Sequence, residues 1–182
     1  MTADSPTAKA PPAPFIVTGE LPADVLAWAD GLRRAHFPPE RNKLAAHVTL
    51  FHAFAPSLRD ELIGVLGSYA AEFAPPKAQL DGLMDLGGGT AFRIHCPALL
   101  AVREGIAEHF HGALTAQDQH SPRLHITIQN KVDRSAARAL QAELAATLKP
   151  LAFAFTGLGL HIYRATHWDS LGTWRFRGKA GA

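Results

Sequence analysis

Two stretches of the sequence, "AHVTLFHAF" from Ala46 and "LHITIQNKV" from Leu124, each place a histidine two residues before a threonine. Successive side chains of a β-strand point to opposite faces, so His47 shares a face with Thr49, and His125 shares a face with Thr127. Aliphatic residues occupy the other face of each stretch. Each stretch therefore predicts a half-buried strand that presents an imidazole beside a hydroxyl group.

The elements around these two strands occur twice in the same order. Apolar periodicity and breaker residues predict β-α-β-α-β over residues 14–86 and again over 90–163, joined by a glycine turn or hinge at 87–89. The expected strands are 14–19, 46–54, 78–87, 90–96, 123–132, 151–165 and 170–178, and the expected helices are 21–37, 57–73, 97–116 and 134–148. The sequence thus predicts an α+β fold of two lobes around a central cleft. Each lobe has an antiparallel-rich sheet with helices outside, and a pseudo-two-fold axis relates the two.

Composition supports one globular unit. The chain has 182 residues, of which 47% are hydrophobic and 19% charged, so we expect a single bilobal domain over 14–178 after a disordered tail at 1–13. The tail lacks the apolar segment of a signal peptide and no run is long enough to span a membrane, which favours a cytoplasmic protein without membrane contact. The lone Cys96 excludes an internal disulfide and is expected to be buried. The oligomeric state is not indicated.

Paired histidines and threonines suit chemistry at phosphorus. Imidazole, with a usual pKa of about 6.5, can take or give a proton near neutrality, so His47 and His125 on opposite sides of a cleft can serve as general base and general acid. The hydroxyls of Thr49 and Thr127 can bind phosphate oxygens and stabilise charge in the transition state. No metal and no other cofactor is required for such a displacement.

Further candidates for substrate binding flank the two motifs. Arg123 shares the face of His125 and could bind a phosphate or simply be exposed, and Phe51 follows the face of His47 and could stack on a base or pack in the core. Tyr163 and His161 share a strand face and could line the cleft or edge the sheet. His52, by parity, is expected on the aliphatic face of its strand.

The paired motifs "HVTL" at 47–50 and "HITI" at 125–128 resemble the signature of the 2H phosphoesterase superfamily, which includes the bacterial 2′-5′ RNA ligase proteins. The resemblance extends over about residues 15–176 and includes the repeated element order and the closing segment "LGLHIYR…WDSLGTWRFRG". It implies a bilobal α+β fold and metal-independent hydrolysis of 2′,3′-cyclic phosphates to 2′-phosphates, with the reverse 2′-5′ joining reaction in some members. It also implies that His47 and His125 are catalytic and that Thr49 and Thr127 bind phosphate.

Net charge leaves the substrate open. A formal charge of +2 without a basic run permits an anionic ligand but marks no long RNA track, so a cyclic nucleotide is as compatible as an RNA 2′,3′-cyclic phosphate end. Two other function classes remain as alternatives. One is a module that binds nucleotides or RNA ends without turnover. The other is a zinc enzyme, for which the sequence lacks H-E-x-x-H and any Cys/His cluster.

Overall fold

A computed structural model describes residues 13–179 of the chain and contains two four-stranded antiparallel sheets. The first sheet has the strand order β2-β1-β7-β8 and the second has the order β5-β4-β3-β6. The strands are β1 (Phe15–Glu20), β2 (Val48–Phe54), β3 (Lys77–Asp85), β4 (Thr90–His95), β5 (His125–Gln129), β6 (Leu151–Ala154), β7 (Gly157–Tyr163) and β8 (Trp168–Arg175). The α+β fold with two lobes is therefore confirmed.

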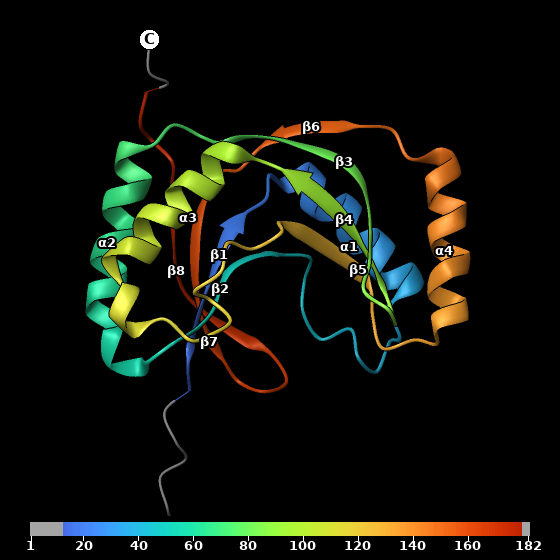
Figure 1. Ribbon diagram of the computed structural model, residues 1–182, viewed down its shortest axis with the longest axis horizontal. Coiled ribbons are helices and arrows are strands. Elements are labelled where there is room, and N and C mark those ends of the chain that lie inside the picture. The colour runs from blue at the N-terminus through green and yellow to red at the C-terminus, as the bar shows by residue number, and fades with distance from the viewer. Residues whose placement is uncertain (1–12, 180–182) are drawn as a thin grey trace, which may run out of the picture.

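Helices flank each sheet. The α-helices are α1 (Ala23–His36), α2 (Arg59–Glu72), α3 (Pro97–His109) and α4 (Arg134–Thr147), and two short 3-10 turns, Pro56–Leu58 and His111–Ala113, accompany them. In Figure 1, α2 and α3 lie beside the first sheet, and α4 lies at the opposite end of the molecule beside the second. Helix α1 contacts β5 of the second sheet. The repeated order β-α-β-α-β is observed twice, with β7 and β8 following the second set.

The two sheets do not coincide with the expected lobes 14–86 and 90–163. Strand β3, from the first half of the chain, pairs with β4 and β6, whereas β7, from the second half, pairs with β1. The expected strand 151–165 accordingly divides into β6 and β7, which belong to different sheets. The glycines at 87–89 join two neighbouring strands of one sheet, β3 and β4, and Gly87 adopts the positive φ of 81° that this turn requires.

The apolar faces of both sheets contribute to a shared core. Buried side chains at helical spacing, such as Leu62 and Leu66 of α2, pack with the aliphatic face of the motif strands, including Leu50 and Ile126. Cys96 is buried in the same core, as expected. No helix in the described residues is long and apolar enough to cross a membrane. The expected tail 1–13 lies outside the described residues except for Ala13.

A β-bulge in β2 changes the parity of that strand. Val17 of β1 pairs with Phe51, while the next residue, Thr18, pairs with Thr49, so Leu50 is the extra residue. After this bulge the two faces exchange, and a second register shift between Phe51 and Phe54 exchanges them back, so the expected parity fails only around Phe51 and His52. Of the two open possibilities for Phe51, packing in the core is the one observed: the ring is fully buried, 4.5 Å from the Arg103 guanidinium. The side chain of His52 is exposed and does not pack with the aliphatic residues.

Asp118 caps the free edge of β2 just after the bulge. Its buried carboxylate accepts the backbone N–H groups of His52 and Ala53 at 3.0 and 3.1 Å, the His52 ring N–H at 3.0 Å and the Thr115 hydroxyl at 3.2 Å. Burial acts to raise the pKa of Asp118, but these hydrogen bonds hold it below its usual value. An edge that would otherwise expose unpaired N–H groups is thereby closed.

We expect Asp118→Ala to lower the free energy of unfolding by about 2 to 3 kcal/mol, because it leaves several donors without a partner. The contribution is present above the usual carboxyl pKa of about 3.9 and is lost as the pH falls through the lower pKa of the folded state. Urea denaturation at pH 7 and at pH 3 measures both effects. Asp60→Ala is the matched control, since Asp60 is exposed and its one ion pair among residues 13–179 is with exposed Arg59. Equal effects of the two substitutions would contradict the role of Asp118.

Candidate active site

The two His/Thr strands are the edge strands of the two sheets, and they face each other. β2 lies at one edge of the first sheet, β5 lies at one edge of the second, and the two strands are in contact. The structure therefore brings both halves of the predicted site together, although they are distant in sequence.

Helix α1 holds both strands. Asp30 accepts the backbone N–H of Ala46, just before β2, at 2.6 Å. Three residues along the same helix face, the buried Arg33 donates to the carbonyl of Thr127 in β5 at 2.7 Å and to Asn42 Oδ1 at 3.1 Å. One helix face thus binds the start of one motif and the middle of the other.

The two catalytic candidates have equivalent hydrogen bonds. His47 Nδ1 lies 2.8 Å from the carbonyl of Ala45, and His125 Nδ1 lies 2.7 Å from the carbonyl of Arg123. In both motifs the acceptor is the residue two positions earlier. A carbonyl oxygen can only accept, so each Nδ1 carries the proton and each Nε2 is left free for a ligand.

The surroundings of His47 keep its ring neutral. Burial lowers the pKa of His47 to about 4, and although the hydrogen bond to Ala45 opposes this shift, the charges of Arg33, His125 and His161 add to it. The indole of Trp168 lies 4.5 Å from the His47 ring, centroid to centroid, and is part of this cover. At neutral pH His47 is therefore a proton acceptor.

Both threonine hydroxyls are unengaged among the described residues. Thr49 and Thr127 are half-buried, and neither hydroxyl forms a hydrogen bond with residues 13–179. Their free donors suit anionic oxygens. Phosphate binding by the two threonines remains a prediction.

His47 lines a pocket of about 330 Å³. Its walls include Trp168, Lys43 and His161, and the indole of Trp168 lies between the rings of His47 and His161, at 4.5 and 5.5 Å. Of the two open possibilities for His161, lining this pocket is the one observed. Sequence reasoning could not select it, because its hydrogen-bond partner Thr18 is 143 positions away.

Two further residues predicted to bind substrate, Tyr163 and Arg123, do not line the pocket itself. Tyr163 is 43% exposed and lines a neighbouring depression that shares Lys43 and Trp168 with the pocket. The side chain of Arg123 is exposed, and its backbone carbonyl orients His125. Substrate binding by these two side chains remains a prediction. In the described part of the chain, no group of three or more His, Cys, Asp or Glu side chains could hold a metal ion.

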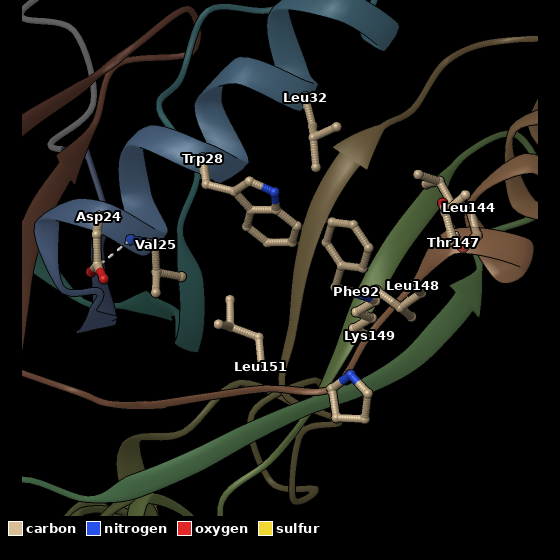
Figure 2. A pocket seen from close by; sticks show the side chains of 11 residues that line it. Asp24, Val25, Trp28, Leu32, Phe92, Leu144, Thr147, Leu148, Lys149 and Leu151 are labelled. Carbon is tan, nitrogen blue, oxygen red and sulfur yellow. Dashed lines mark hydrogen bonds between the residues drawn. The ribbon is translucent and has the colours of Figure 1, made fainter.

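A larger cavity, of about 510 Å³, lies away from this chemistry (Figure 2). Its walls are mostly apolar, and the rings of Trp28 and Phe92 stack in it with centroids 4.9 Å apart. Phe92 pairs with Ile126, whose side chain points away from the face of His125 and Thr127. The cavity therefore belongs to the core side of the second sheet.

We expect Trp168→Ala to raise the pKa of His47 from about 4 toward its usual value of 6.5, because the substitution opens the ring to water. Titration of the His47 ring protons by NMR measures the shift. Trp28→Ala, which removes an indole on the opposite side of the second sheet, should leave the titration unchanged. An unchanged His47 in the Trp168 variant would show that other groups provide the burial.

Comparisons with known proteins agree with this arrangement. The family model of the 2′-5′ RNA ligase superfamily matches residues 21–167. No curated protein matches the chain. Among solved structures, TT0787 of Thermus thermophilus has a TM-score of 0.63 at 17% identity, covering 92% of this chain and all of that one. E. coli LigT complexed with NADP+ has a TM-score of 0.60, and its complex with 3′-AMP has 0.59. Both are 19% identical to this chain; the alignments cover 92% and 91% of it, and 99% and 98% of the LigT chains.

At these identities the structural neighbours establish the fold alone. The family match spans most of the chain, and the paired motifs lie within it. The chain belongs to the 2′-5′ RNA ligase superfamily of 2H phosphoesterases.

Proposed function

We propose that this phosphoesterase hydrolyses 2′,3′-cyclic phosphates of nucleotides or RNA ends to 2′-phosphates, with its two histidines as general base and general acid. The observation that carries the proposal is the equivalence of the motifs. On facing strands, each histidine is held through Nδ1 by the carbonyl two residues earlier, and each keeps Nε2 free beside a free threonine hydroxyl.

The proposed reaction balances without a metal or another cofactor. His47 takes a proton from water as the water oxygen bonds to phosphorus. His125, which enters this step with a second proton on Nε2, gives that proton to O3′ as the P–O3′ bond breaks. Thr49 and Thr127 donate hydrogen bonds to the non-bridging oxygens, whose charge grows in the transition state. With a 5′-hydroxyl in place of water, the same steps would form a 2′-5′ linkage.

Nucleotides are the proposed ligands partly by analogy. The similar E. coli LigT is described in complex with 3′-AMP, NADP+ and phosphate. In this chain, the proposed substrates are a cyclic nucleotide or an RNA end with a 2′,3′-cyclic phosphate. A cytoplasmic location remains a prediction.

We expect His47→Ala and His125→Ala each to lower kcat at least about 100-fold on a 2′,3′-cyclic nucleotide in the presence of a chelator, because each removes a proton-transfer group. Chromatography of the nucleoside 2′-phosphate product measures the rate. His111→Ala, at an exposed histidine outside the site, is the control. Full activity in either variant would refute the role of that histidine. Nucleotide binding without turnover by the unaltered protein would favour a binding module instead.

The pH dependence tests the direction of proton transfer. If His47 acts as the base, it must be neutral. Titration of His47 should then leave kcat/KM constant from neutral pH down to about pH 4, and kcat/KM should fall below that pH as His47 becomes protonated. If His47 were instead the acid, activity would already be lost above about pH 4, where the ring has no proton to give. Stopped assays between about pH 3.5 and 8, with stability checked at each pH, separate the two outcomes.

A further inference from the structure

Three polar side chains form a directed hydrogen-bond chain in the wall of the pocket beside His47. Thr18 Oγ1 lies 2.7 Å from Glu20 Oε1 and 2.9 Å from His161 Nε2. A carboxylate can only accept, so the Thr18 hydroxyl donates to Glu20 and must accept from the Nε2–H of His161. The Nε2 proton of His161 is therefore already used in the hydrogen bond to Thr18.

Glu20 is ionised at the end of this chain. Burial acts to raise the pKa of Glu20, but the neighbouring His161 ring and the hydrogen bond from Thr18 bring it below its usual value. Glu20 Oε1 is also within 3.8 Å of His161 Nε2. The pocket wall therefore carries a negative charge at Glu20 as well as the positive charge of Lys43.

The absence of a side chain at Gly159 leaves space for the hydrogen-bonded side chains of Thr18, Glu20 and His161. A Cβ atom at this position would clash with Glu20 Oε1 and would lie 2.6 Å from Thr18 Oγ1 and 2.9 Å from His161 Nε2. Thr18, the central residue of the chain, pairs with Gly159 on one side and with Thr49 on the other. The three hydrogen-bonded side chains thus lie on the cleft face of the first sheet, directly beside Thr49, which is proposed to bind the phosphate.

The remaining atoms suit a hydroxyl-bearing group. His161 Nδ1 and Glu20 Oε2 form no hydrogen bond with the described residues, and both side chains line the pocket. The indole of Trp168 forms an adjacent aromatic wall, 5.5 Å from the His161 ring. The volume of about 330 Å³ is at the lower end of the usual range for small-molecule sites. An anionic acceptor, an imidazole nitrogen and an aromatic wall match a nucleoside better than a bare anion.

We propose that His161 is a specificity-determining residue whose free Nδ1 accepts a hydrogen bond from a hydroxyl group of the substrate's nucleoside, in the tautomer that Thr18 and Glu20 fix. The phosphate attached to that nucleoside lies between Thr49 and Thr127. Since this assignment rests on the proposed function for the location of the phosphate, its test measures binding rather than turnover.

Two probes separate the nucleoside from the phosphate. Adenosine 2′-monophosphate and inorganic phosphate are each titrated into the full chain, the first by calorimetry and the second by ³¹P NMR. His161→Gln places an amide nitrogen near the position of Nε2 and keeps the link to Thr18 but removes Nδ1. His161→Asn places an amide near the position of Nδ1, where its oxygen can accept a hydrogen bond, and loses the link to Thr18.

We expect His161→Gln to weaken binding of adenosine 2′-monophosphate about 10-fold, the value of one hydrogen bond, while phosphate affinity is unchanged. His161→Asn should retain more nucleotide affinity than His161→Gln. A purely structural role for His161 predicts the opposite order, because only the Gln variant keeps the hydrogen-bond chain.

Gly159→Ala gives a second, independent disruption of the hydrogen bonds among Thr18, Glu20 and His161. We expect it to weaken nucleotide binding with phosphate binding retained, whereas Gly64→Ala, where an added Cβ meets nothing within 4 Å, should change neither. If Gly159→Ala does not fold, the two His161 variants decide. Unchanged nucleotide affinity in His161→Gln, or an equal loss for both probes, would overturn the assignment. A protein that binds in the expected pattern but hydrolyses no cyclic phosphate would overturn the proposed reaction and leave the role of His161 intact.

Discussion

The paired contacts of α1 hold the two halves of the site at a fixed separation. Asp30 binds the start of β2 and Arg33 binds the middle of β5, so the rigid helix determines how far apart the two edge strands lie. Burial lowers the pKa of Arg33, while Asp30 opposes that shift, and the guanidinium satisfies its donors with two oxygens from different segments. A buried cation is costly unless it is paired or hydrogen-bonded, so this contact tolerates little displacement. The facing of His47 and His125 depends on it.

The duplicated motifs become chemically different through residues outside them. His47 and His125 have the same backbone contact, but His47 is close to Trp168 and Arg33, which arise from β8 and α1. The residues whose carbonyls orient the two rings, Ala45 and Arg123, are both exposed, so the difference comes from the groups around His47 and not from the backbone contact. A base and an acid require different environments, so these unequal surroundings of two equal motifs are compatible with the roles proposed for His47 and His125.

Much of this arrangement could be predicted from alternation and element order. The pairing of His47 with Thr49 and of His125 with Thr127 on single strand faces required only the two-residue period of a strand. Alternation failed at Phe51 and His52, because a bulge adds one residue and leaves no mark in the apolar pattern. It also could not divide β6 from β7, since both segments are strand-forming and only pairing partners distinguish them. The role of His161 could not be weighed from sequence, because it is set by residues near the other end of the chain.

The exchange of strands between the two sheets has a consequence for how the molecule can be divided. The glycines at 87–89 mark the midpoint of the repeat. If the chain were cut there, the N-terminal fragment would lack β7, which pairs with β1, and the C-terminal fragment would lack β3, which pairs with β4. Each half of the repeat completes the hydrogen bonding of the other. A half-molecule therefore has no complete sheet of its own, and we expect the two lobes to fold as one cooperative unit.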